Sequence, residues 1–83
     1  MKNRKLLERF MKDNFYLEKF NIHWYSDWLV QLIDTNGDKL SLSTFNPYVI
    51  TCNINSEYYS SYRLEKHLPS GKDMWVVFNE NDR

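Results

Sequence analysis

The sequence predicts a small α+β domain, in which a mostly antiparallel sheet of four or five strands carries an N-terminal helix and a second helix before the last strand, both packed on one face. Three observations predict it. Apolar residues recur with the helical period at the start of the chain and alternate with a period of two in its middle, and an Asp-Thr-Asn-Gly-Asp turn joins two alternating segments. The 83 residues leave room for one domain, residues 1–83, with a single core.

Residues 2–13 are expected to form an amphipathic helix. Its apolar side consists of Leu6, Leu7, Phe10 and Met11. Its opposite side is basic and consists of Lys2, Lys5, Arg9 and Lys12. Asn14 is expected to end the helix in the left-handed conformation.

From Phe20 onwards the period of two predicts a short strand near residues 21–25 and a second at 28–34, unless one bent strand spans both. Two registers compete at the turn that follows. A two-residue Asn-Gly turn would pair Ile33 with Leu40. A three-residue Thr-Asn-Gly loop pairs Leu32 with Leu40 and Val30 with Leu42, and these apolar pairs favour it. Residues 48–54 alternate again and predict a further strand.

Residues 56–68 fit either a helix or a strand. Ser56 could cap a helix and Pro69 would end it, whereas Glu65 would fall within its apolar side. We expect the helix. The last apolar run, residues 74–78, is apolar on both sides and predicts a strand in the interior of the sheet. Four apolar residues group together in either arrangement of 56–68: Tyr58, Tyr62, Leu64 and Leu68.

Composition favours a binding protein. Aromatic residues make up 17% of the chain, more than a core of this size readily holds, so several rings are expected at a contact surface. The formal net charge is zero, which weakens the case for a nucleic-acid-binding protein. Cys52 is the one cysteine, and no segment has the length of a membrane span, so we expect a cytoplasmic protein.

Motifs for catalysis or metal binding are missing from the sequence. The Asp34–Asp38 turn lacks the glycine and glutamate positions of a calcium-binding EF-hand loop. The spacing of His23, Cys52 and His67 matches no zinc signature, and two glycines cannot build a phosphate-binding loop. We therefore expect neither an enzyme nor a cofactor.

Two surfaces are candidates for recognition. The first is a tyrosine-rich segment that would bind a larger protein, consisting of Tyr58, Tyr59, Tyr62, Arg63 and His67. The second is the basic helix side with Lys2, Lys5, Arg9 and Lys12, which would contact nucleic-acid phosphates. The first is preferred, as a protein-binding module or an inhibitor that masks a host partner. A homodimer is also possible. The Asn-, Lys- and Tyr-rich composition is similar in style to small phage-encoded accessory proteins.

Overall fold

The computed structural model describes residues 2–46, 49–67 and 73–78. In this part of the chain a helix, α1 (Lys2–Asn14), is followed by a short 3₁₀ helix, η1 (Leu17–Lys19), and then by strands alone. The strands are β1 (Asn21–Ser26), β2 (Leu29–Ile33), β3 (Lys39–Asn46), β4 (Val49–Ile54), β5 (Glu57–His67) and β6 (Asp73–Phe78).

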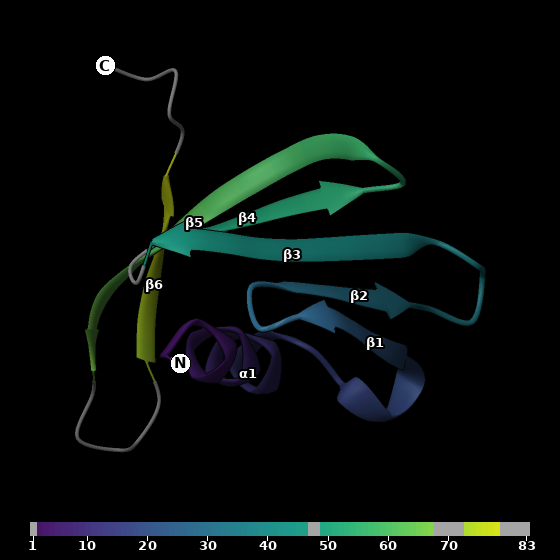
Figure 1. Ribbon diagram of the computed structural model, residues 1–83, viewed down its shortest axis with the longest axis horizontal. Helices are drawn as coiled ribbons and strands as arrows, with labels where there is room; N and C mark the ends of the chain where they lie inside the picture. Colours follow the sequence, from purple (N-terminus) through teal and green to yellow (C-terminus); the bar gives the residue numbers. More distant parts are fainter. Residues whose placement is uncertain (1, 47–48, 68–72, 79–83) are drawn as a thin grey trace.

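The strands form one six-stranded sheet whose order follows the sequence, β1-β2-β3-β4-β5-β6. Each neighbouring pair is antiparallel. Figure 1 shows that the sheet curves around α1, with β1 and β6 on opposite sides of the helix. The predicted α+β class and N-terminal helix are confirmed, and the sheet has more strands than predicted.

The predicted second helix is wrong, because the segment from Glu57 to His67 is the long strand β5. As a strand it places Tyr62 and Leu64 against the core and leaves Arg63 and Glu65 exposed, which removes the conflict that Glu65 creates in a helix. Both long edges of β5 are also paired, with β4 and with β6. These ladders satisfy the backbone groups that a helix would otherwise have satisfied internally.

The core lies between α1 and the sheet. The four apolar residues predicted for the buried side of the helix are all buried, and Phe10 packs edge-on to Phe15 and Trp75 and at a tilt against Tyr62. The opposing wall comes from alternating positions of three central strands: Val30, Leu32, Leu42, Ile50 and Cys52. The amphipathic pattern of residues 2–13 is therefore confirmed.

The β2–β3 hairpin has the predicted three-residue loop and register, with Val30 opposite Leu42 and Leu32 opposite Leu40. Gly37 has a φ of 87°, a left-handed conformation that suits glycine. The backbone N–H of Gly37 donates to the carbonyl of Asp34 (3.1 Å), and the N–H of Asp34 donates to the carbonyl of Asp38 (3.0 Å). This is the type I turn with a glycine bulge that apolar pairing favoured.

Two local predictions fail. Asn14 does not adopt the left-handed conformation; its side-chain amide donates to the carbonyl of Phe10 (2.9 Å) and closes the helix in another way. The strand β6 is not interior, because it is the last strand in the sheet order, and Val76 and Val77 are exposed. Burial on both faces therefore does not explain why β6 is apolar on both faces.

Candidate functional site

The face of the sheet opposite α1, here called the outer face, is lined by small polar side chains. The register places these side chains on the outer face, because residues adjacent to the buried positions point away from the helix. No described helix packs on this face. One row crosses the sheet through Gln31, Ser41, Asn53 and Tyr58, and a parallel row runs through Leu29, Ser43, Thr51 and Ser61.

Tyr58 covers one end of these rows. Its hydroxyl lies 3.1 Å from the hydroxyl of Ser61, which in turn lies 3.5 Å from that of Thr51. Ser61 is fully buried even though it is on the outer face, whereas Tyr58 is 54% exposed. The ring of Tyr58 is therefore held by its polar tip with much of its surface open to a partner.

Tyr25 stands at the opposite end of the rows, on the first strand. Its hydroxyl donates to the Oε1 atom of Gln31 (3.3 Å), and its ring lies edge-on to the His23 ring with 4.3 Å between centroids. Tyr25 is 58% exposed. Tyr25 was not among the residues predicted for the surface. The alternation that places Ile22 and Trp24 on the helix side of the sheet was the signal that His23 and Tyr25 face outward.

Tyr59 occupies a β-bulge. Asn53 pairs with Tyr58 and Cys52 pairs with Ser60, so Tyr59 is the extra residue between them. It is the more exposed of the two neighbouring tyrosines, at 62%. The bulge presents a second ring to solvent beside Tyr58.

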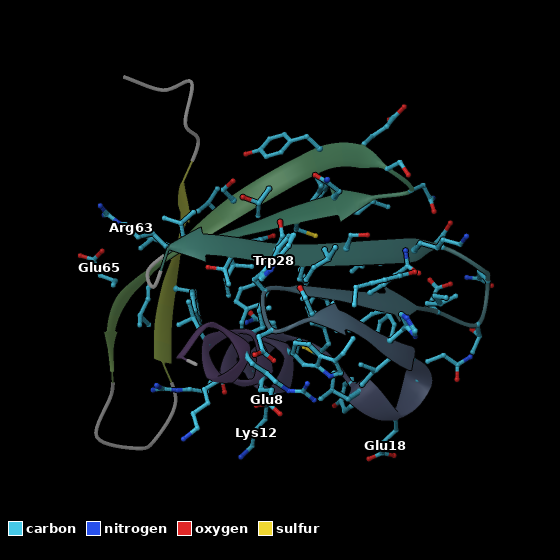
Figure 2. The ribbon with its side chains drawn as sticks, in the orientation of Figure 1. Glu8, Lys12, Glu18, Trp28, Arg63 and Glu65 are labelled. Carbon is cyan, nitrogen blue, oxygen red and sulfur yellow. The ribbon has the colours of Figure 1, made fainter. Side chains whose placement is uncertain are left out.

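Arg63 lies on the same strand and forms an ion pair with Glu65, with 3.1 Å between Nη2 and Oε2. Figure 2 shows both side chains projecting from β5 away from α1. Both are about half exposed, so the pair contributes roughly 0–1 kcal/mol to stability. Breaking the ion pair with Glu65 to form one with a carboxylate on another molecule would therefore cost little free energy.

The other two residues of the predicted tyrosine-rich surface are Tyr62 and His67. Tyr62 belongs to the core, with its ring centroid 4.9 Å from that of Phe10. Burial raises the pKa of its hydroxyl above the ordinary value of 10.0. His67 ends β5, and its side chain lies outside the described part of the structure. Of the predicted surface, Tyr58, Tyr59 and Arg63 are exposed in the structure, and Tyr25 is a further exposed tyrosine of the sheet.

The basic helix side is less uniform than its spacing indicates. Lys5, Arg9 and Lys12 are exposed, and the side chain of Lys2 is not described. Glu8 is exposed among them, three residues after Lys5 and four before Lys12, so it adjoins both on the helix surface. Figure 2 shows Glu8 and Lys12 on the same side of α1, away from the sheet. A carboxylate inside the stripe lowers its attraction for phosphates.

The described residues form neither a metal-binding site nor a reactive thiol site. They contain no group of three or more His, Cys, Asp or Glu side chains placed to hold a metal ion. Burial raises the pKa of the Cys52 thiol above 9.0 and keeps it protonated near neutral pH. Within the described ranges, α1 is too short and too polar to cross a membrane.

The fold and its uncovered face define a small α+β domain built on a six-stranded antiparallel meander. No family model matches the chain, and no match to a curated protein or to a solved structure was found.

Proposed function

We propose that this protein is a non-catalytic protein-binding module that docks a larger partner through the outer face of its sheet. The observation that carries the proposal is the placement of exposed tyrosines at both ends of the two polar rows, Tyr25 at one end and Tyr58 with Tyr59 at the other. Tyrosine combines a large rigid contact area with a hydrogen-bonding tip and loses little entropy when it binds.

The strip between the tyrosines supports contact with a protein surface. Apart from Leu29, its side chains carry hydroxyl or amide groups and most are short, so a partner can approach the sheet closely and form hydrogen bonds. They include Ser41, Ser43, Thr51 and Asn53, which are half-buried. A polar strip with aromatic ends matches the usual interface, in which a few large side chains supply most of the binding energy.

Arg63 indicates the charge of the partner. Its guanidinium is already engaged by a carboxylate in an exposed and weak pair with Glu65. A partner that offers a carboxylate at the same position can form this pair more strongly, because the interface excludes water. We therefore expect an acidic group on the partner opposite Arg63, and a domain of this size would act by covering part of a larger protein, as an inhibitor does.

The test is quantitative affinity capture from a host lysate with the immobilised chain and its variants, followed by mass spectrometry and titration of the recovered protein. Tyr59→Ala and Arg63→Ala should each weaken that protein's binding, and a side chain at the centre of the interface should cost at least about thirtyfold in Kd. Tyr16→Ala is the matched control, because Tyr16 is 79% exposed but lies between α1 and η1, off the sheet.

Two results would contradict the proposal. One is a partner that is retained equally by Tyr25→Ala, Tyr59→Ala and Arg63→Ala. The other is the recovery of nucleic acid alone, lost on nuclease treatment and weakening steeply between low and moderate salt, which would favour the basic side of α1 instead.

A further inference from the structure

The two edges of the sheet differ in how well they are protected against pairing with another strand. An edge strand presents a row of unpaired backbone N–H and C=O groups, and proteins usually blunt it with a bulge, charged residues or a covering element. The β1 edge has such protection. It contains an irregularity between Trp24 and Ser26, and η1 packs against it.

In the described part of the chain the β6 edge has neither a bulge nor a further strand beside it, and Asp73, at its first position, is its one charged residue. Its one neighbour among the described strands is β5. From Met74 to Phe78 it contains no charged residue, proline or glycine, and its residues pair with β5 consecutively, since the irregularity falls on β5 between Leu64 and Lys66. This is the regular, apolar type of edge that accepts a further strand.

Side-chain exposure on β6 agrees with an uncovered edge. Val77 pairs with Tyr62 on the helix side of the sheet, yet α1 leaves it 72% exposed. Val76 pairs with Arg63 on the outer face and is 40% exposed. Adjacent β-branched residues are therefore exposed on both faces of one strand, where pairing with another strand would give each a cross-strand neighbour.

We propose that β6 pairs in antiparallel fashion with β6 of a second copy of the chain, across a twofold axis at Val76, to give one continuous sheet through both copies. In this register Trp75 lies opposite the partner's Val77, and an aromatic residue beside a β-branched one is a favourable cross-strand pair. This dimer uses an edge of the sheet and does not depend on the proposed function of the outer face.

Charge supports a second copy as the occupant. The chain has no net charge, so two copies do not repel each other, and Met74–Phe78 offers an uncharged strand to an uncharged strand. Because the other edge is protected, pairing stops at a closed dimer and does not continue into a fibre.

The test combines sedimentation equilibrium with one substitution at each edge. The wild-type chain should reach twice its monomer mass as concentration rises, and Val77→Lys should raise the dissociation constant at least about tenfold, because a lysine on an edge strand disfavours pairing with a further strand. Tyr25→Lys, an equally drastic change at an exposed position of β1, should dimerise like the wild type. Circular dichroism of each variant checks that the sheet is retained.

A cross-link tests the register independently. Val76→Cys places two thiols across the axis at a separation that a disulfide can span, so mild oxidation should give a covalent dimer. Tyr16→Cys should not give one at the same concentration, and the native Cys52 is buried. A wild-type chain that stays monomeric at all concentrations overturns the proposal, as does a dimer that Val77→Lys leaves unchanged.

Discussion

At the scale of single residues, the most informative comparison is between Tyr58 and Tyr62. They are four positions apart on one strand, so a regular strand would direct both rings to the same face. The bulge at Tyr59 changes the alternation between them. Tyr58 therefore stands on the outer face with its hydroxyl at Ser61, whereas Tyr62 packs on Phe10. One extra residue decides which tyrosine stabilises the fold and which is available to a partner.

Burial of the Cys52 thiol and the Tyr62 hydroxyl predicts a loss of stability at alkaline pH. Burial raises the pKa of each group above its ordinary value, 9.0 for the thiol and 10.0 for the hydroxyl. As the pH rises past these values, the thiol and the hydroxyl lose their protons in the unfolded chain before they do so in the folded chain. The unfolded chain is therefore stabilised relative to the folded one. The free energy of unfolding should therefore fall above about pH 9 and be insensitive to these two groups below about pH 8.

The measurement is urea unfolding at a series of pH values for the wild type and for a variant with both Cys52→Ala and Tyr62→Phe. The variant is less stable at neutral pH, but its stability should decline less as the pH rises. If the difference in unfolding free energy between the two proteins stays constant from about pH 7 to about pH 10, burial does not raise the pKa of either group.

At the scale of elements, two hairpins are joined at their turns. In the β4–β5 turn, the Asn55 side chain accepts a hydrogen bond from the backbone N–H of Lys39 (2.9 Å) and donates to the carboxylate of Asp38 (3.1 Å). The backbone N–H of Asn55 also donates to the carbonyl of Lys39 (2.8 Å). These contacts align the β4–β5 turn with the end of the β2–β3 hairpin and fix the register of the central strands.

The β4–β5 turn contains a residue that glycine should improve. Asn55 and Ser56 both have positive φ, 51° and 71°. Two central residues with positive φ define the tight hairpin turn in which Asn-Gly is the preferred pair, and a left-handed conformation costs a residue other than glycine about 1–2 kcal/mol. Ser56→Gly should therefore raise the free energy of unfolding by up to about 1 kcal/mol, as measured by urea titration.

Gly37→Ala is the converse control for Ser56→Gly. A Cβ atom at Gly37 meets no other atom within 4 Å, so the substitution tests the φ of 87° alone. It should lower the free energy of unfolding by about 1 kcal/mol. A destabilising Ser56→Gly together with a neutral Gly37→Ala would mean that backbone conformation does not control these turns.

At the scale of the whole molecule, one core holds the helix and the sheet together. The buried side of α1 packs against β3 and β6, and Phe10 contacts rings from the segment after the helix and from two strands. The guanidinium of Arg4 lies 4.1 Å from the centre of the Trp24 ring and joins the helix to β1 as well. With a single core, helix and sheet should unfold together.

Phe10→Ala tests this cooperativity. Removing a fully buried aromatic side chain should lower the free energy of unfolding by about 3–5 kcal/mol, and Phe10→Leu should fall between this variant and the wild type. Tryptophan fluorescence and far-ultraviolet circular dichroism should give the same midpoint in urea for each variant. Tyr16→Ala should change stability by less than about 0.5 kcal/mol. Separate midpoints for the two signals would show that the helix is not part of the same core.

Much of the fold could be predicted from short stretches of sequence. The buried side of residues 2–13, the strands near 21–25 and 28–34 and the hairpin at Gly37 depend on periodicity or turn chemistry among neighbouring residues. In the candidate surface, Tyr58, Tyr59 and Arg63 could be named because exposed aromatic and arginine side chains are typical of interfaces. Tyr25 was missed because its role depends on distant strands that place it across the sheet.

The sequence by itself determined the helix, the central hairpin and the excess of aromatic rings over what one small core can bury. Tertiary structure alone decided that Glu57–His67 is a strand, that the bulge separates Tyr58 from Tyr62, and that β6 lies at an edge. The reason is that the apolar pattern of residues 56–68 is compatible with both a helix and a strand. Its backbone hydrogen bonds are formed with β4 and β6, so the choice depends on residues outside the segment.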